Sequence, residues 1–419
     1  MMSVAPMFLC CSPLVIAADA QTSISTALHT LESVRAISEV AISPDGRHVV
    51  YGSVMTGTRN GAEVDVTALF LADAHDGSHV QRLTACPQTA CNEHTVAWSP
   101  DGTRIAYVTT DATEQPQLAV AAADGSGVHV ITHAHGPLDT PRWSPDGKRI
   151  AFLYSAGAPK TPGPLNPLSR DAGVLTSTVY EQRLAIVADT GGEPTLIGPA
   201  DLNIYEYDWS PDGRRFVVSA AHGSGDDNWW IAELDLLDAQ SGAPTTLAKP
   251  ALQIASPRWS ADGSRIAYIA GIMSDEAITG GDVYVISAAG GAPVNATPSL
   301  KASVNTVTFN GSARRLIATE FAAGEEVLAV IDVDTKTQRE LWRGPQMIWA
   351  NTLLGFAPGD SGISLSKNGA FSAVIRQSYT SPPEVETGPP GKWKTRTSGT
   401  PDLSPARTTN RATESGIMK

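Results

Sequence analysis

Hydrolases that use a serine nucleophile commonly hold it in a G-x-S-x-G turn, and the sequence contains no such string. The nearest string, Gly359-Asp360-Ser361-Gly362, has the wrong spacing. All nine histidines lie at or before His222, so none occupies the late position that the chain order Ser, Asp, His requires. A P-loop and an H-E-x-x-H motif are also absent. The sequence therefore predicts no catalytic residue and no cofactor-binding residue.

The histidine pattern offers little for a metal ion. His133 and His135 form an H-A-H string, a spacing that puts both side chains on one side of a strand. Zinc sites in proteins use three or four ligands, and no third ligand accompanies this pair. We expect no metal site and no cofactor.

Two acidic segments that contain glycine are candidate recognition loops: the string G-D-D-N-W-W, and the string M-S-D-E-A-I-T-G-G-D, which begins at Met273. The carboxylates of the second segment, Asp275, Glu276 and Asp282, could bind a cation or a substrate amine. The alternatives are a tight turn that leads into a buried strand for the first segment and a solvated loop for the second. The candidate residues are Asp226, Asp227, Trp229, Asp275 and Glu276.

A repeated phrase indicates the scaffold that would position these loops. The phrase reads W-S-P-D-G-T-R-I-A-Y in its clearest form, and its seven copies begin at Ile42, Trp98, Trp143, Trp209, Trp259, Phe309 and Leu365. Ser-Pro-Asp-Gly predicts a turn, because Pro presets φ, Asp bonds nearby backbone and Gly accepts positive φ. The polar and apolar residues that follow alternate, which is typical of a strand with one buried face.

The spacing between copies predicts the fold. Their Asp positions are 45 to 66 residues apart, which suits four strands plus loops. Further strand segments lie between the copies, at Leu69–Ala72, Leu118–Val120, Leu184–Val187, Thr195–Ile197, Val283–Ile286 and Val327–Ile331. We therefore predict an all-β domain over residues 37–386, a β-propeller of seven blades with TolB-like W-S-P-D-G repeats. A β-sandwich is the alternative. The Pro-rich residues 156–180 form an insertion on one face.

The N-terminal residues resemble an export signal. Met7–Ala18 is largely apolar and Ala18-Asp19-Ala20 resembles a cleavage site, although no Lys or Arg precedes the apolar run. The run is too short to span a membrane. We predict a signal peptide over residues 1–20, a lead-in segment over 21–36, and a periplasmic or secreted protein. A lipid anchor at Cys10 or Cys11 is the alternative.

Removal of the signal leaves Cys86 and Cys91, which flank a short loop. An even pair in an exported chain favours a local disulfide, and two free thiols or a metal pair are the alternatives. The net charge of −13 argues against nucleic acid as the main partner.

The composition changes near residue 387. Residues 387–419 hold six Lys and Arg against two Asp and Glu, and Leu403 and Ile417 are their only branched aliphatic residues. Such a segment cannot bury a core, so we predict a disordered tail.

Several longer strings carry a family resemblance, from about Ile37 to Trp393. They are Y-E-Y-D-W-S-P-D-G from Tyr205, G-D-D-N-W-W from Gly225, I-M-S-D-E-A-I-T-G-G-D-V-Y from Ile272, and S-Y-T-S-P-P-E-V from Ser378. With the repeats, they make the chain resemble the N-terminal propeller of the prolyl oligopeptidase family of serine peptidases, in particular its dipeptidyl-aminopeptidase and acylaminoacyl-peptidase-like branch.

In that family the last blade leads into an α/β-hydrolase domain that holds the catalytic Ser, Asp and His. The present sequence ends soon after the matching exit, so no catalytic residue is carried over, and a truncated or frameshifted product after about Gly391 is the expectation. The resemblance implies a propeller that restricts access of peptide substrates to a hydrolase domain and is inactive alone.

Two other functions remain open on sequence grounds. A stand-alone TolB-like propeller of the periplasm would bind a protein partner. An enzyme working within the propeller, as some lyases and glycosidases do, would need paired carboxylates, and no spacing singles out Asp226 or Asp275 for that role.

Overall fold

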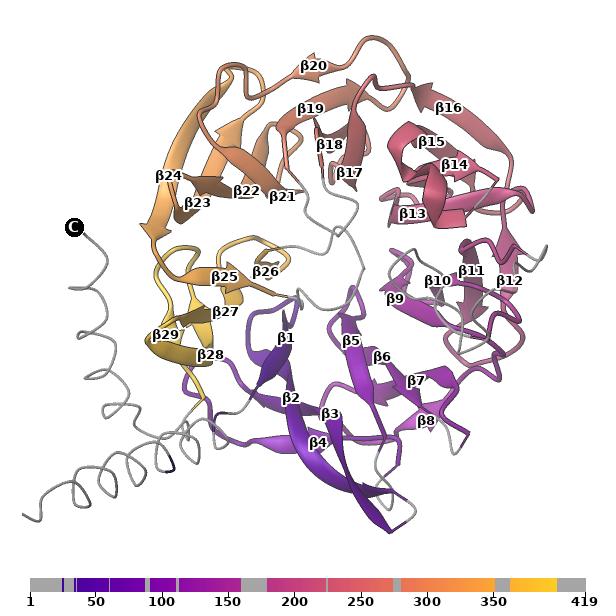
Figure 1. Cartoon of the computed structure of the whole chain (residues 1–419), viewed down its shortest axis with the longest axis vertical. Helices are drawn as coiled ribbons and strands as arrows, with labels where there is room; N and C mark the ends of the chain where they lie inside the picture. Colours follow the sequence, from indigo (N-terminus) through magenta and orange to yellow (C-terminus); the bar gives the residue numbers. More distant parts are fainter. Residues whose placement is uncertain are drawn as a thin grey trace, which may run out of the picture.

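The computed structural model describes residues 36–59, 61–86, 91–110, 113–159, 179–223, 225–273, 280–350 and 362–397, together with residues 25 and 34. In these residues, seven antiparallel sheets surround a common centre (Figure 1). Each sheet is one blade made of consecutive strands. The fold is a seven-bladed β-propeller, which confirms the fold predicted from the repeats. The predicted signal and nearly all of the lead-in segment lie outside the described residues.

The strands follow one another blade by blade around the ring. Blade 1 contains β1 (Ile37–Ile42), β2 (His48–Arg59), β3 (Ala62–Asp73) and β4 (Gln81–Leu83). Blade 2 contains β5 (Glu93–Trp98), β6 (Arg104–Thr110), β7 (Pro116–Ala122) and β8 (His129–Val130). Blade 3 contains β9 (Leu138–Trp143), β10 (Arg149–Tyr154), β11 (Arg183–Ala188) and β12 (Thr195–Ile197). Blade 4 contains β13 (Leu202–Trp209), β14 (Arg215–His222), β15 (Glu233–Asp238) and β16 (Pro244–Ala248). Blade 5 contains β17 (Gln253–Trp259), β18 (Arg265–Gly271), β19 (Asp282–Ser287) and β20 (Val294–Asn295). Blade 6 contains β21 (Ser303–Phe309), β22 (Arg315–Ala322), β23 (Glu325–Asp332) and β24 (Thr337–Gly344). Blade 7 contains β25 (Met347–Trp349), β26 (Ser364–Leu365), β27 (Ser372–Ser378), β28 (Ser381–Gly388) and β29 (Lys394–Thr395), and both β25 and β26 pair with β27.

The antiparallel order gives the ring two different faces. Each blade starts at the centre and proceeds outward, so the turns from first to second strand and from third to fourth strand lie on one face, which we call the turn face. The turns from second to third strand, and the links between blades, lie on the opposite face, which we call the link face. All seven copies of the repeat place their turn on the turn face. The start of β1 and the end of β29 lie at the link face.

The repeat turn is held by its own serine and aspartate. The Ser hydroxyl donates to the Asp carboxylate at 2.5 to 2.7 Å in the first five copies. In copy two, the N–H of Arg104 donates back to Ser99 Oγ at 2.9 Å, and Gly102 has a φ of 72°. The hydrogen bond from Ser99 is the main cause that lowers the pKa of Asp101 to about 2. The turn chemistry predicted from the sequence is confirmed in these atoms.

The Trp and Arg of the repeat join neighbouring blades. Indole N–H groups donate to main-chain carbonyls of the preceding blade at 3.0 to 3.2 Å, in the pairs Trp98–Ala41, Trp143–Ala97 and Trp209–Arg142. The repeat Arg of the preceding blade lies over the same indole at 4.7 to 5.2 Å, in the pairs Arg104–Trp143, Arg149–Trp209 and Arg215–Trp259. The joints at Trp143 and Trp209 therefore combine an indole hydrogen bond with a cation–π contact.

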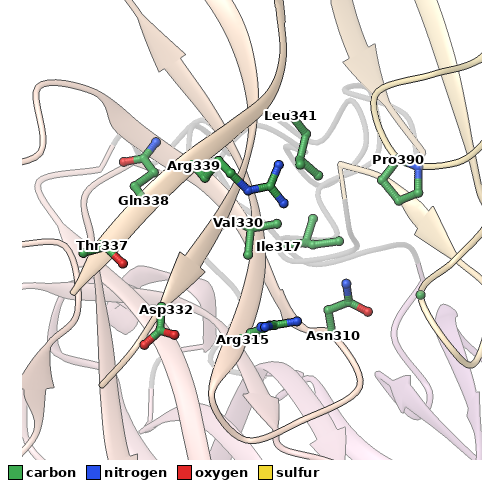
Figure 2. A pocket seen from close by; sticks show the side chains of 11 residues that line it. Asn310, Arg315, Ile317, Val330, Asp332, Thr337, Gln338, Arg339, Leu341 and Pro390 are labelled. Atoms are coloured by element: carbon green, nitrogen blue, oxygen red, sulfur yellow. The ribbon is translucent and has the colours of Figure 1, made fainter. Parts of the chain in front are cut away.

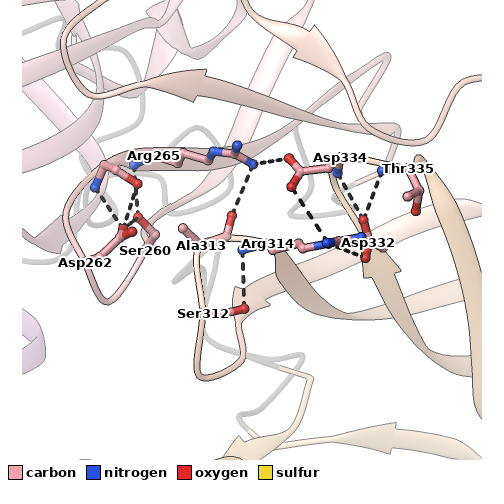
Figure 3. Close-up of polar contacts among 10 residues, drawn as sticks. Ser260, Asp262, Arg265, Ser312, Ala313, Arg314, Asp332, Asp334 and Thr335 are labelled. Carbon is pink, nitrogen blue, oxygen red and sulfur yellow. Dashed lines mark hydrogen bonds and ion pairs between the residues drawn. The ribbon is translucent and has the colours of Figure 1, made fainter.

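The joint between blades 5 and 6 keeps the Arg and replaces the indole contact with an ion pair. Phe309 stands at the Trp position of the sixth copy. Arg265 reaches across to Asp334 at 2.7 Å and to the carbonyl of Ala313 at 3.4 Å (Figure 3). Asp334 also lies 3.8 Å from Arg314.

The ring closes between blades 7 and 1 without a shared strand. The N–H of Val40 donates to the carbonyl of Ala350 at 2.7 Å, and the N–H of Lys367 donates to the carbonyl of Pro44 at 2.9 Å. Apolar side chains from both blades form one cluster that includes Ile375. Hydrogen bonds and packing close the ring, a point that the degenerate end copies left undecided.

Blade 7 extends beyond residue 387, where the change in composition placed the tail. β28 ends at Gly388 and β29 adds a further pair of residues. The indole of Trp393 donates to Ser372 Oγ at 2.8 Å and lies 5.8 Å from the ring of Trp342 in blade 6. The composition misplaced the boundary because an exposed edge strand such as Lys394–Thr395 needs no aliphatic residue.

Blade 6 buries a carboxyl group. Glu320 is 1% exposed and accepts two hydrogen bonds from Gln338 Nε2, at 2.9 and 2.7 Å. Burial, with the nearby Glu340 adding to it, raises the pKa of Glu320 to about 7. The pKa in the folded state thus lies above the ordinary value of 4.5. The free energy of unfolding therefore falls as the pH rises from 4.5 toward 7, because Glu320 loses its proton in the unfolded chain before it does so in the folded protein.

Loss of a joint contact should destabilise the ring. We expect Arg149→Ala to lower the free energy of unfolding by about 1–3 kcal/mol, since it removes the contact with Trp209 and the hydrogen bond to the Gly213 carbonyl. Urea denaturation followed by tryptophan fluorescence measures the change. Arg47→Ala is the control, because that side chain is 75% exposed, and it should shift stability by less than about 0.5 kcal/mol. Equal effects of the two variants would contradict the joint's role.

Removal of the buried acid should change the pH dependence of stability. We expect Glu320→Gln to stabilise the protein at pH 8 by on the order of 2 kcal/mol, and this gain should vanish by about pH 4.5. Urea denaturation of parent and variant at several pH values measures the difference. A gain that is independent of pH would show that Glu320 is not protonated in the folded protein near neutral pH.

Candidate functional site: the link face

Three connections that contain segments singled out in the sequence begin and end at the link face. The segment between Tyr154 and Arg183 joins the second and third strands of blade 3. The 3-10 helix η1 (Gly225–Ile231) occupies the same position in blade 4, and the segment between Gly271 and Asp282 does so in blade 5. The topology therefore places η1, and the strand ends that flank the other two segments, at one face of the ring.

The two tryptophans of η1 have different environments. Trp229 is buried, and its indole N–H donates to the carbonyl of Ile254 in blade 5 at 3.3 Å. Trp230 is 50% exposed and Ile231 is 67% exposed. Trp229 thus lies in the core between two blades, while its neighbours are available at the surface.

The acidic candidates give no geometry to interpret. Asp226 and Asp227 lie in η1, but their side chains are outside the described structure. Asp275 and Glu276 are among residues 274–279, which are also outside it. Their role remains a prediction from the sequence.

Exposed apolar side chains are concentrated on the link face. Ile272 is 90% exposed beside the blade 5 loop, and Tyr379 is fully exposed in the turn between β27 and β28. Val80 and Val294, by contrast, lie where the fourth strand of a blade begins, toward the turn face, Val80 just before β4 and Val294 at the start of β20. The large apolar residues exposed at or near the link face are Val179, Trp230, Ile231, Leu252, Ile272, Phe321, Met347 and Tyr379. The sequence offered a signal for some of them, because isolated large apolar residues in turns are unusual where polar residues normally lie.

A histidine–carboxylate pair also lies at this face. His222 Nδ1 is 3.0 Å from Asp201 Oδ2, and both side chains are more than half exposed. The hydrogen bond from His222 lowers the pKa of Asp201. In the described part of the chain, no hydroxyl group hydrogen-bonds to the His222 ring, so the pair lacks the nucleophile that a serine hydrolase triad requires.

Carboxylates near the centre of the ring serve the joints. Glu39 accepts hydrogen bonds from the N–H groups of Thr95 and Val96 at 2.8 and 2.9 Å, and burial raises its pKa. Glu206 accepts one from the N–H of Ser256 at 2.6 Å. Each glutamate thus binds backbone of the next blade at a residue with positive φ, Thr95 or Ser256. These contacts give Glu39 and Glu206 a structural role.

The described residues contain no group of three His, Cys, Asp or Glu that could hold a metal ion. His133 and His135 are both exposed in the segment between β8 and β9, where no strand is formed, so the strand assumed for this pair was wrong. No helix in the described ranges is long and apolar enough to cross a membrane.

The two cysteines in the described residues are joined. A disulfide links Cys86 and Cys91, whose Cα atoms are 6.4 Å apart. The bridge lies in the link from blade 1 to blade 2, and therefore at the link face.

No protein-family model matches the sequence, and no curated protein matches it. Solved structures do match the fold. An acylaminoacyl peptidase in complex with Z-Gly-Gly-Phe-chloromethyl ketone aligns with a TM-score of 0.61 at 14% identity, covering 88% of this chain and 53% of that one. A structure from work on two prolyl endopeptidases aligns with a TM-score of 0.55 at 15% identity, covering 94% and 55%.

A third structure is a propeller domain on its own. The β-propeller domain of the Trilobed protease from Pyrococcus furiosus, described as having an open velcro topology, aligns with a TM-score of 0.60 at 13% identity. The alignment covers 88% of this chain and 98% of that domain, whereas the chain spans about half the length of the acylaminoacyl peptidase. At identities this low, the structural similarity establishes a shared fold and no more. The chain has the seven-bladed propeller fold found in acylaminoacyl and prolyl peptidases.

Proposed function

We propose that this chain is the substrate-gating propeller of a serine peptidase of the prolyl oligopeptidase family, without catalytic residues of its own. The observation that carries the proposal is the concentration of exposed apolar side chains on the link face. Residues such as Ile272 and Tyr379 expose apolar surface to water there. Exposure of this surface is unfavourable in free energy, and a protein domain packed against the face would bury it.

The topology supports a catalytic domain as that partner. The start of β1 and the end of β29 lie at the link face, so a hydrolase domain following blade 7 would begin beside the apolar side chains. A domain packed there would cover one end of the ring. Peptides would then reach its active site only through the propeller or along the interface, which favours short or flexible substrates.

The proposed location is the periplasm or the cell exterior. The Cys86–Cys91 disulfide supports an oxidising compartment, because such bonds are rare in reducing ones. A stand-alone propeller that binds a separate protein is the alternative function, and it would use the same apolar face.

The test begins with the DNA that follows the codon for Lys419. We expect a frame there to encode an α/β-hydrolase domain with Ser, Asp and His in that order. The purified chain alone should not hydrolyse acyl-peptide or dipeptidyl p-nitroanilides, and the chain should bind the separately expressed hydrolase domain in calorimetry.

Matched double variants locate the interface. We expect Ile272→Ser with Tyr379→Ser, on the link face, to weaken binding at least about tenfold, because each buried apolar side chain contributes about 1.5–3 kcal/mol. Val80→Ser with Val294→Ser, on the turn face, should leave binding unchanged. Absence of an encoded hydrolase domain, or equal binding by both double variants, would overturn the proposal, and a specific non-hydrolase partner would establish the alternative.

A further inference from the structure

The joint between blades 6 and 7 lacks the contact that the repeat Arg makes in the joints that follow blades 2 to 5. Leu365 stands at the Trp position of the seventh copy, and Gly311 stands at the Pro position of the sixth. In blades 2 to 4 the repeat Arg lies over an indole of the next blade, and in blade 5 it pairs with a carboxylate. Arg315, the equivalent residue of blade 6, has no aromatic ring beneath it among the residues that the structure describes.

A cavity occupies this joint. It has a volume of about 510 Å³ and lies between the outer strands of blade 6 and the turn that joins β28 to β29 (Figure 2). Ile317, Val330 and Leu341 form an apolar floor, and Pro390 lies across from them. A volume of this size lies within the range that holds small organic ligands, roughly 300–1,000 Å³.

Two arginines line the cavity from the same side of blade 6. The strand register aligns Arg315 with Asp332, and aligns Val330 with both Ile317 and Arg339, so these side chains share one face of the sheet. Within the described ranges, neither Arg315 nor Arg339 forms an ion pair or a side-chain hydrogen bond. Both are exposed in the cavity wall, and they present two guanidinium groups to one space.

The nearby carboxylate is already engaged. Asp332 accepts hydrogen bonds from Thr335 N–H at 3.0 Å and from Arg314 Nε at 2.7 Å. The hydrogen bond from the Thr335 backbone, followed by that from Arg314, lowers the pKa of Asp332 to about 2. The lining therefore keeps an excess of positive charge in a protein whose net charge is −13.

The chemistry of the lining selects a ligand class. A planar guanidinium binds a carboxylate through two parallel hydrogen bonds and also stacks on flat apolar groups. The floor and Pro390 offer an apolar surface beside the two guanidinium groups. We propose that this cavity binds a small organic carboxylate with a flat apolar body, such as an aromatic carboxylic acid.

This site is independent of the proposed gating function. Arg315 begins β22, Asp332 ends β23 and Thr337 begins β24, so this part of the cavity lies toward the turn face. Loss of ligand binding at the cavity and loss of partner binding at the link face can therefore be measured separately.

Calorimetric titration of the full chain with phenylacetate tests the proposal. We expect saturable binding that is at least tenfold tighter than that of phenylacetamide, which lacks the charge, or of inorganic phosphate, which lacks the apolar body. Arg315→Gln and Arg339→Gln should each weaken phenylacetate binding at least tenfold. Arg343→Gln is the matched control, because Arg343 lies on β24 but pairs with Glu340 and Glu325 outside the cavity lining, and it should bind as the parent does.

A second variant fills the space. Val330→Trp places a large side chain on the apolar floor of the cavity, so it should abolish phenylacetate binding. If this variant does not fold, the arginine variants decide the question alone. Equal binding of phenylacetate and phenylacetamide, equal binding of phosphate, or arginine variants that bind like the parent would each overturn the proposal.

Discussion

The structure depends on the contact by which one blade holds the next. In the regular joints the indole of one blade donates backward to a main-chain carbonyl, while the arginine of the preceding blade lies over that indole. A single contact of this kind contributes about 0.5–2 kcal/mol. The contribution recurs around the ring, however, and because blades 1 and 7 share no strand, every joint has to be stable through side chains and turns.

This constraint also separates the two faces. The residues that make the joints, such as Trp143, Ser144 and Arg149, belong to or flank the turns of the turn face. Their types are fixed by packing and turn geometry, so the turn face has little freedom to vary. The connections of the link face differ in length from blade to blade, and apart from Trp229 of η1 they contribute little to the joints described above. Most of the large apolar residues that are exposed in the described part of the chain lie at or near that face.

The sequence predicted the parts that repeat. Seven copies of one phrase defined the blade number, the turns and the anchoring Trp, because each of these depends on local residue types at fixed spacing. It could not place the end of blade 7, since Lys394–Thr395 is an exposed strand that looks like a polar tail. Nor could it distinguish Trp229 from Trp230, because only the packing of blade 5 buries the first. The cavity beside Arg315 was equally hidden, as it arises from two blades that meet only in the folded ring.

Degenerate copies of a repeat are usually treated as a weak fold signal, but they also carry structural information. The seventh copy keeps Ser366, Asn368 and Gly369, which shape its turn, while Leu365 stands at the Trp position. Without an indole at that position, Arg315 of blade 6 lies in the wall of the cavity with no aromatic ring beneath it among the described residues. A departure from the consensus at a joint therefore changes which side chains face the space between two blades, and it can leave a charged group available to a ligand.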